Sequence, residues 1–173
     1  SPNDLTVRSD GTIYFTDPAW QLGDRTQELD HAVYRVDPEG NVNLAQALAD
    51  RRPNGVTLSP DETKLYVSVI EPDQILVFDV AGDGSLSNQQ TFVDAGSDGM
   101  AIDCAGNLYA TSGVVHVYSP EGDEIGSITL EGSAGGLPDP TNLAFGGANR
   151  STLYVTGASY LRSVELQIPG YPF

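Results

Sequence analysis

The sequence is poor in cysteine, in basic residues and in long apolar runs. Its single cysteine, Cys104, excludes an intrachain disulfide framework and any cysteine-based metal cluster. Eight Lys and Arg against 24 Asp and Glu give a formal net charge of -16, which would repel phosphate backbones and anionic lipid. We therefore expect neither nucleic acid nor a membrane as a partner. Most of the carboxylates fit a solvated surface, and a few could hold a cation.

The first residues, SPNDL, show neither an initiator Met nor the charged and apolar segments of a signal peptide. We expect a mature, trimmed or excised segment whose N-terminus is cut and whose C-terminus is natural. The compartment, whether cytoplasmic or periplasmic or secreted, stays open. A length of 173 residues suffices for one domain with a sizeable core.

Four segments of the chain resemble one another at a spacing of 43 to 51 residues, a range typical of solenoids and propellers. They begin at Pro2, Pro53, Ser97 and Pro140. Each holds a short alternating strand, a turn, and a second strand with a tyrosine at one register, namely Tyr14, Tyr66, Tyr109 and Tyr154.

A third strand-like run follows in every unit, as AVYRVD, QILVFDV, VVHVYSP and YLRSVEL, and a fourth in the first three units, as VNLAQAL, QQTFVDA and EIGSITL. Four short strands per unit predict an all-β fold built from β-propeller blades. The repeat units are expected at 1–50, 51–95, 96–138 and 139–173, within a single propeller domain 1–173. A sandwich would not explain the recurring residues, and LAQALAD is the only short helical candidate.

The Asn54-Gly55 pair stands directly in front of an expected strand, where no hairpin is needed, so Asn54 is placed for its side chain. The aligned positions in the four units are Asn3, Asn54, Asp98 and Thr141. First strands of blades line a propeller's channel, so these side chains are expected to converge. Amide and carboxylate oxygens suit a hard divalent cation, which a buried Asp98 would need. The alternative is that they are turn residues that bond to their own backbone.

These motifs carry a family resemblance. SPNDLTVRSDGTIYFTDP, PNGVTLSPDE and DGMAIDCAGNLYAT resemble the signature segments of the SMP-30/gluconolactonase, or regucalcin-like, family. The resemblance implies a six-bladed β-propeller with one divalent metal ion in its channel, acting as a lactonase on sugar lactones. About four of the six blades are present here, and the N-terminal blades are expected to be missing.

The resemblance also implies site residues. Asn54 and Asp98 match metal ligands, and Asn3 matches an asparagine that binds metal or substrate. Ca²⁺ is the expected metal, with Zn²⁺, Mn²⁺ and Mg²⁺ as alternatives. The family's remaining ligand, a glutamate near the start of the first blade, has no counterpart here. Ser1 stands where some members have a sugar-binding arginine, so their substrate preference does not carry over.

The expected mechanism has the metal as Lewis acid and Asp98 as the catalytic group that activates or orients water. No Gly-x-Ser-x-Gly elbow supports a nucleophilic route. Trp20, His31 and Thr141 are candidate substrate-binding residues beside Asn3, although packing explains Trp20 equally well. His116 lies on a third strand and is expected to be structural.

An incomplete ring would expose two blade faces and unpaired strand edges, so blades from a longer parent chain or from another chain are expected to complete it. The isolated chain is expected to show little or no lactonase activity. The competing hypotheses are a non-catalytic propeller scaffold, a calcium-binding protein, and a related hydrolase of organophosphates.

Overall fold

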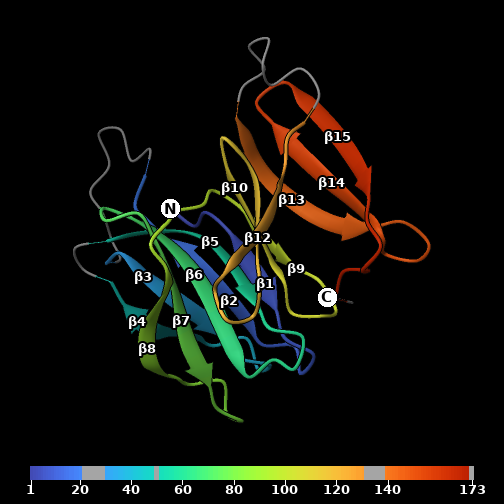
Figure 1. Cartoon of the computed structure of the whole chain (residues 1–173). Coiled ribbons are helices and arrows are strands. Elements are labelled where there is room, and N and C mark those ends of the chain that lie inside the picture. The colour runs from blue at the N-terminus through green and yellow to red at the C-terminus, as the bar shows by residue number, and fades with distance from the viewer. Residues whose placement is uncertain (21–29, 49–50, 131–138, 172–173) are drawn as a thin grey trace. The chain divides into compact units, whose positions relative to one another are not determined.

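The computed structural model describes residues 1–20, 30–48, 51–130 and 139–171. All regular structure in these residues is β-strand, which confirms the all-β prediction. None of the described segments is a helix long and apolar enough to cross a membrane. The strands form four antiparallel sheets, each built from consecutive strands in chain order (Figure 1). These sheets are the propeller blades predicted from the repeat, and we number them 1 to 4.

Blades 1 and 2 belong to a first compact unit, Ser1–Gly96. Blade 1 contains β1 (Leu5–Val7), β2 (Ile13–Asp17), β3 (Ala32–Val36) and β4 (Val42–Ala47). Blade 2 contains β5 (Arg52–Leu58), β6 (Lys64–Ile70), β7 (Gln74–Val80) and β8 (Leu86–Val93). Residues 44–47 of the LAQALAD segment thus lie in a strand, as their place at the end of the first repeat predicted, and residues 49–50 lie outside the described residues.

Blades 3 and 4 belong to a second compact unit, Ser97–Pro172. Blade 3 contains β9 (Met100–Ile102), β10 (Leu108–Ser112), β11 (Val114–Tyr118) and β12 (Glu124–Ile128). Blade 4 has three strands, β13 (Pro140–Gly146), β14 (Thr152–Gly157) and β15 (Tyr160–Glu165). The single domain and the four repeat boundaries expected from the sequence stay predictions.

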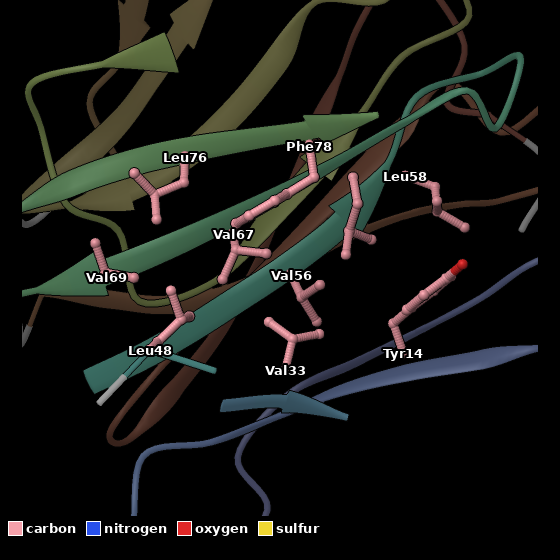
Figure 2. Close-up of a cluster of buried hydrophobic side chains, with 10 residues drawn as sticks. Tyr14, Val33, Leu48, Val56, Leu58, Val67, Val69, Leu76 and Phe78 are labelled. Atoms are coloured by element: carbon pink, nitrogen blue, oxygen red, sulfur yellow. The ribbon is translucent and has the colours of Figure 1, made fainter. Parts of the chain in front are cut away.

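The core of the first unit lies between its two blades. Tyr14 and Val33 point from blade 1 toward Val56 and Leu58 of β5 (Figure 2). The whole cluster comprises Tyr14, Val33, Leu48, Val56, Leu58, Leu65, Val67, Val69, Leu76 and Phe78, all of them buried. Alternation along each strand sends these side chains to one face of the sheet, so their burial holds the two blades together.

The core of the second unit has the same plan. Tyr109 and Val115 of blade 3 pack with the buried Leu153 of β14 and its neighbours in blade 4. The ring of Tyr109 meets that of Phe145 edge to face, with the centroids 5.2 Å apart. Such aromatic pairs contribute about 0.5–1.5 kcal/mol beyond the area they bury.

Asn54 and Gly55 lie inside β5, and not in front of a strand as the sequence pattern suggested. The pairing of β5 with β6 shifts register between Pro53 and Val56. Extra residues in one strand let a sheet bend and re-aim a side chain, so the pair forms a bulge within the ladder. The turn-like composition therefore marks an irregularity in a strand.

Candidate functional site

The four aligned positions have different surroundings. Asn3 is exposed ahead of β1, and Asn54 is buried in β5 with 4% of its surface exposed. Asp98 is exposed ahead of β9, and Thr141 is exposed within β13. Asn3 and Asn54 belong to the first unit, and Asp98 and Thr141 to the second.

In the first unit a buried threonine of β2 connects two of these positions. The Asn3 N–H donates to the carbonyl oxygen of Thr16 at 2.9 Å. The hydroxyl of Thr16 donates to the carbonyl oxygen of Asn54 at 2.7 Å. Thr16 is fully buried. The backbones of Asn3 and Asn54 thus both bond to Thr16, Asn3 to its backbone carbonyl and Asn54 to its hydroxyl.

The second unit repeats this arrangement. The Asp98 N–H donates to the carbonyl oxygen of Thr111 at 3.0 Å, and the Thr111 hydroxyl donates to the carbonyl oxygen of Thr141 at 3.4 Å. Thr111 is 1% exposed. In both units a second-strand threonine therefore bonds to the aligned residue of its own blade and to that of the next.

Sequence reasoning missed these threonines, although a signal for them exists. A hydroxyl residue stands two positions after each aligned tyrosine, at Thr16, Ser68, Thr111 and Thr156. Side chains two residues apart in a strand point to the same face of the sheet. The hydroxyl and the tyrosine therefore share one face, which in blades 1 and 3 is turned toward the next blade of the same unit.

The side-chain oxygen Oδ1 of Asn54 is the strongest sign of a bound ligand. It is buried, and among the described residues it has no hydrogen-bond partner. A buried polar atom left unsatisfied costs about 1–3 kcal/mol. A cation would remove this cost, because amide oxygens are ordinary ligands of hard divalent ions. Asn54 thus fits a metal site on its own geometry.

The other ligands of a metal ion at Asn54 would also be oxygen atoms. In residues 1–20, 30–48, 51–130 and 139–171, no group of three His, Cys, Asp or Glu side chains could hold a metal ion. Among the described residues, amide and backbone oxygens such as Asn54 Oδ1 are therefore the available ligands beside any single carboxylate. We expected a buried Asp98 to need a cation, but this reason does not apply, because Asp98 is exposed. An exposed carboxylate is instead open to water and to a substrate.

Two of the residues that directly follow the aligned positions, Asp4 and Gly99, lie against the neighbouring blade. The carboxylate of Asp4 accepts hydrogen bonds from the N–H groups of Leu5 and, across the blades, Val56, at 2.9 and 3.1 Å. In the second unit, a Cβ added to Gly99 would lie 2.4 Å from Oδ1 of Asn142. Glycine at this position therefore leaves room for the neighbouring blade.

The remaining candidates show backbone contacts. The carbonyl oxygen of Trp20 accepts from the Ser1 hydroxyl at 2.8 Å, and that of His31 accepts from the Leu48 N–H at 2.8 Å. Both residues are half-buried. The loop between them, residues 21–29, lies outside the described residues. Their roles in substrate binding stay predictions.

His116 has a different kind of environment. Its Nδ1 lies 2.8 Å from the carboxylate of Glu124 on the neighbouring strand β12, and its Nε2 lies 3.2 Å from the carbonyl oxygen of Ser112. Its ring also stacks on Tyr118. These contacts occupy both ring nitrogens within blade 3, which agrees with a structural role.

A second buried polar contact lies at the turn between β9 and β10. The Asp103 carboxylate accepts from the Asn107 N–H at 2.9 Å and from the Tyr109 hydroxyl at 3.3 Å. Burial and the nearby Asp103 charge together raise the pKa of Tyr109 to about 12. This pair fixes the tyrosine that packs against blade 4.

Antiparallel sheets of three or four strands that repeat along the chain with a shared tyrosine register define a β-propeller protein. Residues 1–159 match the family described as SMP-30/Gluconolactonase/LRE-like region, and the chain belongs to this family.

Curated relatives agree with this assignment. The chain is 33% identical to a gluconolactonase of Zymomonas mobilis over 177 residues, which cover 91% of this chain and 48% of that protein. It is 29% identical to the pentonolactonase XacC of Haloferax volcanii over 156 residues, covering 82% of this chain and 51% of the relative. The chain therefore spans about half the length of these relatives.

Solved structures show the same fold. The gluconolactonase XC5397 of Xanthomonas campestris has a TM-score of 0.81 at 33% identity, over 98% of this chain and 57% of that one. The calcium-binding protein regucalcin of Agrobacterium tumefaciens has a TM-score of 0.78 at 22% identity, over 98% and 62%. The latter likeness concerns the fold alone.

Proposed function

We propose that the protein containing this chain is a divalent-metal-dependent hydrolase that opens sugar lactones. The observation that carries the proposal is the buried Oδ1 of Asn54, which has no hydrogen-bond partner in the described part of the chain. The relatives called gluconolactonase and pentonolactonase support the substrate class. Both names denote enzymes that act on cyclic esters of sugar acids.

Asn54 and Asp98 are the metal ligands in this proposal, and Asn3 binds the metal or the substrate. Ca²⁺ is the preferred ion, because two amides and one carboxylate form an all-oxygen donor set. Zn²⁺, Mn²⁺ and Mg²⁺ remain alternatives. When bound, the ion would supply Lewis-acid polarisation of the lactone carbonyl.

The chain's own residues supply the proton chemistry. The exposed carboxylate of Asp98 accepts a proton from the attacking water or orients that water. General-base catalysis of this kind is typically worth about 10²–10⁴-fold in rate. Trp20, His31 and Thr141 are proposed to contact the sugar ring. The hydrogen bond from Thr16 to the Asn54 carbonyl holds the ligand residue in place.

Proton release during hydrolysis of glucono-1,5-lactone tests the proposal on the intact protein. Activity should disappear with EDTA, return with added Ca²⁺ or Mn²⁺, and fall at least about 10²-fold in Asp98→Asn. Asp123→Asn, which changes an exposed carboxylate in the turn between β11 and β12, is the matched control and should keep full activity. Full activity in EDTA, or in Asp98→Asn, would refute the proposed mechanism. A protein that binds metal but hydrolyses no lactone would instead be a calcium-binding scaffold.

A further inference from the structure

Asn54 and Gly55 together form the bulge of β5. The pairing of β5 with β6 shifts register between Pro53 and Val56, so two residues of β5 face the single residue Ser68 of β6. A bulge leaves its extra residue outside the regular ladder, and a glycine in the bulge has no side chain that would fix its conformation. The direction of the Asn54 side chain therefore depends on contacts other than those with β6.

Two side chains of blade 1 bind the backbone on the two sides of this glycine. The Thr16 hydroxyl donates to the carbonyl oxygen of Asn54 at 2.7 Å. The carboxylate oxygen Oδ2 of Asp4 accepts from the Val56 N–H at 3.1 Å. Asn54 and Val56 directly precede and follow Gly55 in the chain. Blade 1 therefore holds both neighbours of the glycine and restricts the conformation of the bulge.

Asp4 is itself anchored to the second strand of its blade. Its carbonyl oxygen accepts from the Thr16 N–H at 3.0 Å, and its own N–H donates to the Thr16 hydroxyl oxygen at 3.2 Å. Its second carboxylate oxygen, Oδ1, accepts from the Leu5 N–H at 2.9 Å. The side chain thus reaches Val56 from a backbone and a rotamer that are both fixed by hydrogen bonds.

The two oxygens of this side chain serve two different N–H donors, and only a carboxylate suits both. An amide has one accepting oxygen, and its NH₂ group would face the N–H of either Leu5 or Val56. A charged acceptor also makes the stronger hydrogen bond. The other blades carry Gly55, Gly99 and Asn142 at the position of Asp4. The acid therefore occurs in the blade that contacts the bulge of the candidate ligand.

We propose that Asp4 is a positioning residue for the metal ligand Asn54, and that its hydrogen bond to the Val56 N–H raises the affinity of the site for the cation. This inference rests on the proposed function, in which Oδ1 of Asn54 binds the metal ion. That oxygen is buried and has no hydrogen-bond partner among the described residues, so the backbone of the bulge determines where it points. Loss of a group that orients a metal ligand typically weakens metal binding about 10–100-fold.

Calorimetric titration of Ca²⁺ into the intact protein and two variants of Asp4 tests the proposal. In Asp4→Asn the dissociation constant should rise about 10–100-fold, because one of the two N–H groups then faces a donor. Asp4→Ser is the second variant. Its hydroxyl can still accept from the Leu5 N–H but is too short to reach Val56, so it should weaken binding as well.

Asp37→Asn is the matched control. Asp37 also lies in blade 1 and also accepts a backbone N–H through its carboxylate, from Asn41 at 2.7 Å, but it does so at the turn between β3 and β4. Its replacement should leave the affinity for Ca²⁺ unchanged. Circular dichroism should show that all variants are folded at the temperature of the titration.

Hydrogen exchange of the metal-free protein gives a second readout, which requires neither activity nor bound metal. The Val56 amide should exchange faster in Asp4→Asn than in the unmodified protein, whereas the amides of β7 should exchange at the same rate in both. Unchanged exchange at Val56 would show that the hydrogen bond from Val56 to Asp4 does not hold the bulge, and would overturn the proposal.

The titrations distinguish a failure of this proposal from a failure of the proposed function. If the unmodified protein binds Ca²⁺ and Asn54→Ala does not, but the folded Asp4 variants bind as tightly as the unmodified protein, only the role of Asp4 is refuted. Equal weakening in Asp37→Asn and Asp4→Asn would also refute that role. Binding of none of Ca²⁺, Mn²⁺, Zn²⁺ and Mg²⁺ by the unmodified protein, or equal binding by Asn54→Ala, would refute the proposed function, and the role of Asp4 with it.

Discussion

The hydroxyl of Thr16 donates a 2.7 Å hydrogen bond to the carbonyl oxygen of Asn54 and so joins the second strand of blade 1 to the first strand of blade 2. Both residues are buried, at 0% and 4% exposure. The position of the candidate ligand is therefore fixed by the neighbouring blade. Thr111 and Thr141 form the same link in the second unit.

Replacement of Thr16 tests this link. Thr16→Val keeps the shape of the side chain but leaves the buried Asn54 carbonyl without its donor, which should cost about 1–3 kcal/mol of unfolding free energy. Thr16→Ser keeps the hydroxyl and should lose less. Urea unfolding measures both, with Thr91→Val on the exposed surface of β8 as control. Equal stability of Thr16→Val and Thr16→Ser would mean that the hydrogen bond is unimportant.

Gly99 is predicted to tolerate no larger side chain. Its Cβ in Gly99→Ala would lie 2.4 Å from Oδ1 and 2.7 Å from Cα of Asn142. Because one of these atoms belongs to the backbone, the strand itself must shift, at a cost of about 1–3 kcal/mol. Gly126→Ala is the control, since no atom lies within 4 Å of the added carbon. If Gly99→Ala and Gly126→Ala lowered the melting temperature by the same amount, the close approach of Gly99 to Asn142 would be contradicted.

Tyr109 should ionise later than an ordinary tyrosine. Burial first, and then the Asp103 charge, raise its pKa from 10.0 to about 12. The folded state keeps this proton longer than the unfolded state, so the stabilisation is complete below pH 10 and is lost as the pH rises toward 12. Burial also raises the pKa of Tyr14, Tyr34 and Tyr118, so absorbance titration at alkaline pH should show several late phenols, one fewer of them in Tyr109→Phe. The stability of that variant should also fall less steeply over this interval. Loss of a phenol that titrates near pH 10 in Tyr109→Phe, with the late phenols unchanged in number, would contradict this prediction.

The sequence predicted the strands and blades because their signals are local. Alternating apolar residues and the tyrosine register, repeated from Tyr14 to Tyr154, specify which residues form strands and which face is buried. The exposure of single site residues depends on contacts between blades. Asn54 is buried and Asp98 is exposed although they share one position of the repeat. The bulge at Asn54 and the link through Thr16 likewise depend on the neighbouring strand and blade, which no short segment encodes.

The central claim, that Asn54 provides an oxygen ligand to a divalent cation, is tested most directly by calorimetric titration of Ca²⁺ into the intact protein and its Asn54→Ala variant. The account predicts one binding event in the unmodified protein and its loss or strong weakening in the variant, while Asn43→Ala on the exposed strand β4 binds as before. Equal binding by the unmodified protein and Asn54→Ala, or no binding of Ca²⁺, Mn²⁺, Zn²⁺ or Mg²⁺ by either, would contradict it.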